Sequence, residues 1–219
     1  MIVSVPSIEM REVLHFLGWR GGSVEESLLD QIRAIMRLVR EEIKPCVITR
    51  SFGIDADYKL DDTVFSPEGK DVRRILETRS SAILMAATLG VQSERLLLRW
   101  QARSAADALL MDAVLSAAIE AVCDEQERIL RASYGEKGLY LTDRFSPGYG
   151  DMPLGQTKEI CAVLQTEKTI GLTVSGSGIM IPRKSVTALL GVSSLEQSRR
   201  PSPCSVCTMR ETCALRKRG

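Results

Sequence analysis

The chain has 219 residues, with 29 basic and 28 acidic side chains and a net charge of +1. Its 44% hydrophobic and 26% charged content is that of an ordinary globular protein, and it excludes a disordered chain, a collagen-like chain and a disulfide-dense miniprotein. Because the charges balance, the chain has no overall positive electrostatic field that would attract nucleic acid or an acidic membrane surface. The length suits one substantial domain with at most a tail.

The sequence predicts neither a membrane span nor a secretory signal. Its most apolar stretch, residues 81–91, is about half the ~20 residues that a crossing helix needs. The first residues lack a basic region followed by a long apolar run. We therefore expect a cytoplasmic protein without membrane or nucleic-acid partners, whose six cysteines are thiols or metal ligands. The single histidine, His15, nearly excludes a Ser-His-Asp hydrolase unless it is itself the base.

In the first half of the chain, apolar residues recur at helical spacing and alternate with two strand-like runs. Ser23 has the character of a helix N-cap, with two glutamates in the first turn after it. The expected elements are helices over 8–17, 23–43 and 71–77, strands over 46–54 and 82–89, and an acidic loop or hairpin over 55–62.

The second half contains a long run of helix formers, residues 93–133, which we expect to break near 102–104. The later helix, 105–132, carries a face of small residues that lets another backbone approach closely. Several glycine and proline residues then predict a loop before a further helix. The remaining expected elements are a helix over 156–164 and a small antiparallel sheet from 172–174, 179–181 and 185–192. Without regular βαβ alternation, the predicted class is α+β.

The segment that begins at Arg144 contains several residues that could bind a ligand. Arg144 can bind a carboxylate or phosphate through a bidentate, charged pair of hydrogen bonds. Pro147 pre-sets one turn torsion and Gly148 can supply a positive φ, so the turn presents backbone groups to a ligand. Tyr149 adds a ring face and a hydroxyl, and the set suits an amino-acid-bearing nucleoside. The alternative is a surface turn in which Arg144 pairs with a nearby acid such as Asp143.

The same segment resembles the reactivation domain of cobalamin-dependent methionine synthase, in a stand-alone form. The S-adenosylmethionine site of that family carries an Arg-x-x-x-Gly-Tyr motif, which Arg144, Gly148 and Tyr149 match. The likeness covers roughly residues 8–193, and its further segments are 82–90, 112–125, 156–159, 170–173 and 180–186. The chain departs from the family in lacking corrinoid, folate and homocysteine modules, and residues 171–194 hold no match for a later ligand-contacting tyrosine.

The resemblance implies an activation-domain-like α+β fold over residues 1–195, with a twisted antiparallel sheet flanked by helices that include the long helix around 105–132. It implies a helper that presents S-adenosylmethionine to a corrinoid cofactor oxidised to inactive cob(II)alamin. A flavodoxin- or ferredoxin-type donor then supplies one electron to the cob(II)alamin. This reduction is unfavourable by itself, but the irreversible methyl transfer that follows removes its product. The cobalamin belongs to a partner, a methionine synthase core or another corrinoid methyltransferase, so this chain acts in trans.

The resemblance also implies roles for individual residues. Arg144 would hold the methionyl carboxylate, the Ser146 backbone would read the adenine or amino-acid portion, and Tyr149 would line the cofactor face, with Gly148 also among the cofactor-binding residues. Glu120 matches a family acid near the ligand in an ungapped alignment and could face the ammonium or sulfonium group. The alternative for Glu120 is a solvated helix glutamate.

The basic tail, residues 196–219, contains a C-x2-C-x5-C cluster formed by Cys204, Cys207 and Cys213. Three such thiolates can hold an iron–sulfur cluster or zinc together with a fourth ligand, or they can remain reduced and empty. The candidates for the fourth ligand are Cys46, Cys123 and Cys161. The alternative function is therefore an iron–sulfur redox or binding module that delivers electrons to a corrinoid protein.

Overall fold

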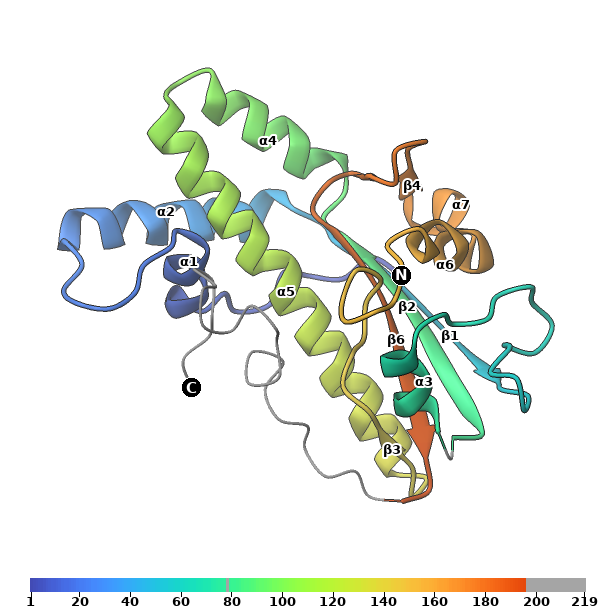
Figure 1. The fold of residues 1–219 in the computed structure, drawn as a ribbon. Helices are drawn as coiled ribbons and strands as arrows, with labels where there is room; N and C mark the ends of the chain where they lie inside the picture. The colour runs from blue at the N-terminus through green and yellow to red at the C-terminus, as the bar shows by residue number, and fades with distance from the viewer. Residues whose placement is uncertain (78, 196–219) are drawn as a thin grey trace.

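A four-stranded antiparallel sheet separates two groups of helices (Figure 1). The computed structural model describes residues 1–77 and 79–195. Its helices are α1 (Met10–Phe16), α2 (Glu26–Glu42), α3 (Lys70–Leu76), α4 (Val91–Gln101), α5 (Ala105–Gly135), α6 (Gln156–Leu164) and α7 (Thr166–Ile170). Its strands are β1 (Cys46–Gly53), β2 (Ser81–Thr88), β3 (Tyr140–Leu141), β4 (Thr173–Val174), β5 (Met180–Ile181) and β6 (Ser185–Ser193). The predicted α+β class, with its mostly antiparallel sheet and long helix, is confirmed.

The sheet has the order β1-β2-β6-β3, and every neighbouring pair is antiparallel. The central strand β2 is buried from Ala82 onward. Its side chains alternate between two apolar clusters, with Met85 in one and Leu84 in the other. Burial on both faces explains why this strand reads as an unbroken apolar run in the sequence.

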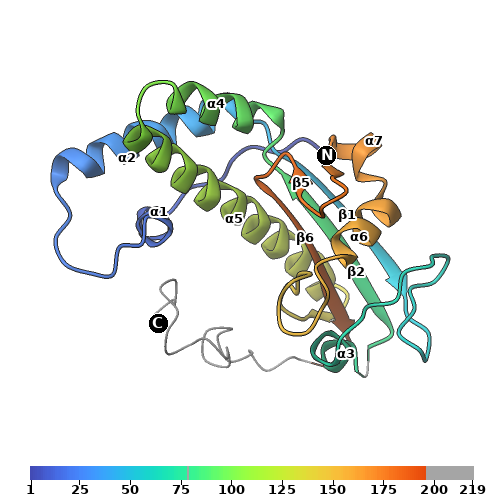
Figure 2. The ribbon, with the colours of Figure 1, turned by 45° about the horizontal axis from the view of Figure 1, so that its top comes forward.

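The two faces of the sheet are covered by different helices. Helices α1, α2, α4 and α5 contribute to the apolar cluster on one face, where α5 runs alongside the strands (Figures 1 and 2). The cluster on the other face takes its residues from α3, α6, α7 and the loop that contains Phe65, which is fully buried. The segment that carries the Arg-x-x-x-Gly-Tyr motif follows β3, at the edge of this sheet.

Helix α5 begins where the sequence predicts. The chain leaves α4 at Gln101, and the Ser104 hydroxyl accepts a hydrogen bond of 3.0 Å from the Asp107 N–H. This N-cap satisfies a backbone donor that the helix leaves unpaired, which fixes the break that was expected near 102–104. Ala117 and Ala118 are buried on the helix, in keeping with the close packing expected of its small residues.

The start of α2 differs from the prediction. Ser23 is not its N-cap, since the helix begins at Glu26 and the N-cap position is Glu25, whose side chain makes no capping bond. Gly21 and Gly22 have φ of +115° and +100°, so the connection from α1 continues in a non-helical path past the first candidate cap.

The small sheet predicted for the last strands is also wrong in its pairing. Strands β4 and β5 form a separate two-stranded sheet, whereas β6 lies between β2 and β3 in the main sheet. Nearly every residue of β6 is buried, so this strand needs apolar cover on both faces, which a short hairpin cannot supply. Strand β3 and helix α7 were not predicted, and they contain only two and five residues.

Candidate functional site

The backbone that leads to Arg144 is fixed along the edge of β6. The Thr142 N–H donates to the Gly191 carbonyl at 3.0 Å, and the Gly191 N–H donates to the Thr142 hydroxyl at 2.8 Å. Phe145 and Leu189 exchange two backbone hydrogen bonds of 2.9 and 2.8 Å. Arg144 is therefore placed between two points at which the chain is tied to the sheet.

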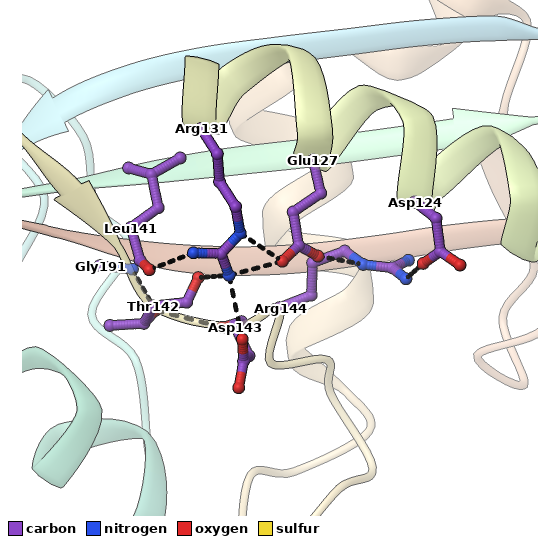
Figure 3. A network of polar contacts seen from close by, with 8 residues as sticks. All are labelled: Asp124, Glu127, Arg131, Leu141, Thr142, Asp143, Arg144 and Gly191. Atoms are coloured by element: carbon purple, nitrogen blue, oxygen red, sulfur yellow. Dashed lines mark hydrogen bonds and ion pairs between the residues drawn. The ribbon is translucent and has the colours of Figure 1, made fainter. Parts of the chain in front are cut away.

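The Arg144 guanidinium meets three acids of helix α5. Its Nε donates to Glu127 Oε2 at 2.9 Å, and its Nη2 donates to Asp124 Oδ1 (Figure 3). The same Nη2 lies 3.6 Å from Glu120 Oε2. These acids lie at helix positions i, i+4 and i+7, which share one face of a helix. The structure thus brings together Arg144 and Glu120, two predicted site residues that are distant in the sequence, and the Arg144 side chain is only 17% exposed.

A second arginine, Arg131, connects the same helix to the incoming backbone. Its Nη2 lies 2.6 Å from Glu127 Oε1, and its Nη1 donates to the Leu141 carbonyl at 2.6 Å (Figure 3). Its Nη2 also lies 2.9 Å from Asp143 Oδ1. Asp143, the local partner considered for Arg144 in the sequence, therefore pairs with Arg131. Glu127 is shared by the two arginines, and sequence reasoning did not identify it.

The charges around Arg144 keep it protonated. Burial alone would lower the pKa of Arg144, but the nearby Cys123 and the carboxylates of Asp124, Glu120 and Glu127 outweigh that effect, and the pKa is raised. The Cys123 thiol is buried beside this group, and burial raises its pKa to about 12 although Arg144 opposes the shift. At neutral pH the site holds a permanent cation, while Cys123 is a neutral thiol with little nucleophilic character.

The Ser-Pro-Gly-Tyr turn forms as predicted. The Tyr149 N–H donates to the Ser146 carbonyl at 3.1 Å, and Gly148 has a φ of +89°. Pro at the second position and a positive φ at the third define a type II turn. The Gly148 N–H donates to the Met152 carbonyl at 2.9 Å, so this hydrogen bond lies within the loop. Tyr149 is 63% exposed, and its ring is available to a ligand or a partner.

Two polar residues that sequence reasoning did not select anchor this loop to the start of α3 and to the segment just before it. The Asp151 carboxylate accepts hydrogen bonds from the Lys70 and Asp71 N–H groups at 2.7 and 3.0 Å, which lower its pKa. The buried Gln156 side chain donates to the Ser66 carbonyl and accepts from the Glu68 N–H, both at 2.9 Å. No local pattern identifies these residues, because their partners are 80 to 90 positions away.

The predicted metal ligands Cys204, Cys207 and Cys213 lie outside the described residues. Within residues 1–77 and 79–195, no three His, Cys, Asp or Glu side chains gather in a way that could hold a metal ion. A shallow open hollow of about 450 Å³ in the acidic loop, lined by residue 55 and residues 59–64, contains none of the predicted site residues. None of the helices in this described part is long and apolar enough to cross a bilayer.

Comparison with known proteins identifies the fold. No family model matches the chain, and no curated protein matches it. Among solved structures, the chain is similar to one described as the crystal structure of the MetH reactivation domain bound to AdoHcy. The match has a TM-score of 0.64 at 15% sequence identity, and it covers 93% of this chain and 80% of that chain. At this level of identity the likeness concerns the fold, and this chain has the fold of the MetH reactivation domain.

Proposed function

We propose that this chain is an S-adenosylmethionine-binding reactivation module that supports reductive methylation of cob(II)alamin in a methionine synthase or related corrinoid methyltransferase. The observation that carries the proposal is the shared fold, since the similar domain was solved with AdoHcy bound. The motif residues Arg144, Gly148 and Tyr149 support it, because they occur in one ordered segment at the edge of the sheet. The chain carries out this role in trans and in the cytoplasm.

Arg144 and Glu120 offer the two charges that an amino-acid ligand requires. Arg144 is permanently cationic, and its planar guanidinium can hold the methionyl carboxylate with two parallel hydrogen bonds. Glu120, which lies 3.6 Å from Arg144, would face the ammonium or sulfonium group. A zwitterionic ligand with an added sulfonium charge fits such a pair of opposite charges.

The turn after Arg144 would hold the rest of the ligand. The Ser146 backbone would read the adenine or amino-acid portion, with Gly148 allowing a close approach because it has no side chain. The exposed Tyr149 ring would line the face turned toward the partner's corrinoid. S-adenosylmethionine supplies the methyl group on its sulfonium, and this chain contributes by binding and orienting that ligand.

The experiment is an anaerobic assay with a corrinoid protein in the cob(II)alamin state, S-adenosylmethionine and a reductant or a flavodoxin- or ferredoxin-type donor. We expect the added chain to accelerate methylcobalamin formation, followed by absorbance, whereas the chain alone synthesises no methionine. Equal rates with and without the chain, across methionine synthase cores and other corrinoid methyltransferases, would count against the proposal.

The alternative candidate is an iron–sulfur redox or binding module that delivers electrons to a corrinoid protein. The C-x2-C-x5-C spacing of Cys204, Cys207 and Cys213 favours it, because such thiolates are typical ligands of iron–sulfur clusters and of zinc. Absorbance of the anaerobically purified protein separates the two functions, since a cluster absorbs visible light and S-adenosylmethionine does not. Metal analysis of the same sample identifies zinc, and a colourless, metal-free protein would remove this candidate.

A further inference from the structure

The three acids that contact Arg144 differ in exposure, and Glu120 is intermediate at 42%. The Glu127 side chain is 16% exposed, and its two carboxylate oxygens are divided between Arg144 and Arg131. The Asp124 side chain is 71% exposed, although it makes a close contact with Arg144. An exposed ion pair contributes only about 0.2–1 kcal/mol, since water competes for both charges. Asp124 is therefore the exchangeable partner of Arg144, and Glu127 is the fixed one.

The two acids also occupy different parts of the guanidinium. Glu127 accepts from Nε, and Asp124 accepts from Nη2. Nη2 together with Nη1 forms the end of the guanidinium that a ligand carboxylate grips with two bonds. An incoming carboxylate thus meets Asp124 at this end, with Glu120 farther away at 3.6 Å from the same Nη2, while Glu127 holds the Nε side of the group.

We propose that Asp124 is an internal competitor for the ligand carboxylate, an inference that rests on the proposed function. In the unliganded protein Asp124 occupies the Nη2 end of Arg144. The ligand carboxylate displaces Asp124, and Glu127 keeps the guanidinium in place through Nε, so Glu127 acts as a positioning residue. The competitor lowers the measured affinity by the fraction of molecules in which Arg144 is already paired.

The test is calorimetric titration of S-adenosylmethionine into the wild-type chain and the Asp124→Asn variant. We expect the variant to bind about two- to fivefold more tightly, which corresponds to the strength of an exposed ion pair. Glu125→Gln is the matched control, because it removes the same charge from the same helix, and Glu125 pairs with Arg128. Its affinity should equal that of the wild type.

A ligand analogue without the carboxylate sharpens the test. It cannot compete with Asp124 for Arg144, so its affinity should be the same for the wild type and for Asp124→Asn. Unchanged or weaker binding of S-adenosylmethionine by Asp124→Asn would overturn the proposal. Weaker binding of both ligands would identify Asp124 as a contact to the ammonium or sulfonium, which also overturns it.

The wild type and Arg144→Ala distinguish a failure of this inference from a failure of the proposed function. Absence of S-adenosylmethionine binding to the wild type overturns both. Wild-type binding that Arg144→Ala weakens, with no gain in Asp124→Asn, overturns the competitor and leaves the proposed function intact. Asp124 is mostly exposed, so its variant is expected to fold, and circular dichroism confirms this in the same samples.

Discussion

Arg144 and the turn at Gly148 are four residues apart in one motif, yet different interactions hold them. Arg144 is held by charged side chains of α5, chiefly Glu127, at 2.9 Å. The turn is held by its own backbone hydrogen bonds, by Asp151, which binds N–H groups at the start of α3, and by Gln156, which binds backbone groups just before α3. The motif therefore spans two supports, one made of ion pairs and one made of backbone hydrogen bonds.

The two supports should respond to different perturbations. Ion pairs weaken as salt screens them, because the Debye length falls to about 3 Å at 1 M salt, and the mostly buried Arg144–Glu127 pair is screened less than the exposed Asp124 contact. Neutral hydrogen bonds such as those of the buried Gln156 side chain depend little on salt, but they cost much when one partner is lost. The arginine and the turn can therefore be disturbed separately.

The largest expected effect on stability belongs to the backbone support. Gln156→Leu fills a similar volume but leaves the Glu68 N–H and the Ser66 carbonyl without their partner. We expect a loss of about 2–3 kcal/mol in the free energy of unfolding, measured by urea denaturation. The loss should be nearly the same at low and high salt. Lys158→Leu, at an exposed position of the same helix, is the control, and an equal loss there would contradict the role of Gln156.

A smaller effect is expected at the charged support. Glu127→Gln keeps the shape of the side chain but removes the carboxylate shared by Arg131 and Arg144. We expect a loss of about 1–2 kcal/mol in the free energy of unfolding at low salt, which shrinks as salt is raised. Glu125→Gln should change stability little, since its pair with Arg128 is exposed. No loss of stability in Glu127→Gln would contradict the role of its carboxylate in fixing this region.

The smallest effect concerns the pH dependence at Asp151. Hydrogen bonds from Asp71 and Lys70 lower the pKa of this carboxyl, so it contributes stability above the ordinary aspartate pKa of about 4. That contribution is lost as the pH falls through the lowered pKa of the folded state. The difference in urea midpoint between the wild type and Asp151→Asn should be full at pH 7 and shrink below about pH 4. A difference that stays constant down to pH 2 would contradict this assignment.

Features fixed by local chemistry could be predicted from the sequence. The turn follows from a proline beside a glycine, and Gly148 adopts the positive φ that this pattern requires. The break before α5 follows from Ser104, whose side chain caps the helix as N-cap residues do. The apolar run of β2 predicts a strand buried on both faces, and it is.

Features that depend on distant parts of the chain could not be predicted. The partners of Arg144 are set by which turn of α5 lies opposite the edge of β6, and spacing along the chain carries no such information. The local choice of Asp143 as partner therefore missed Asp124 and Glu127. The place of β6 was also missed, because a largely apolar segment fits a hairpin as well as a central strand until its cover is known.

Binding of S-adenosylmethionine to the wild type and to Arg144→Ala, measured by isothermal titration calorimetry, tests the central claim most directly. Arg128→Ala is the control, since this arginine is also near α5's charged surface but pairs with Glu125. If Arg144 holds the methionyl carboxylate, Arg144→Ala should weaken binding by about 2–3 kcal/mol, roughly 30- to 150-fold, and Arg128→Ala should leave it unchanged. Equal affinity of the wild type and Arg144→Ala, with both folded, would contradict the assignment.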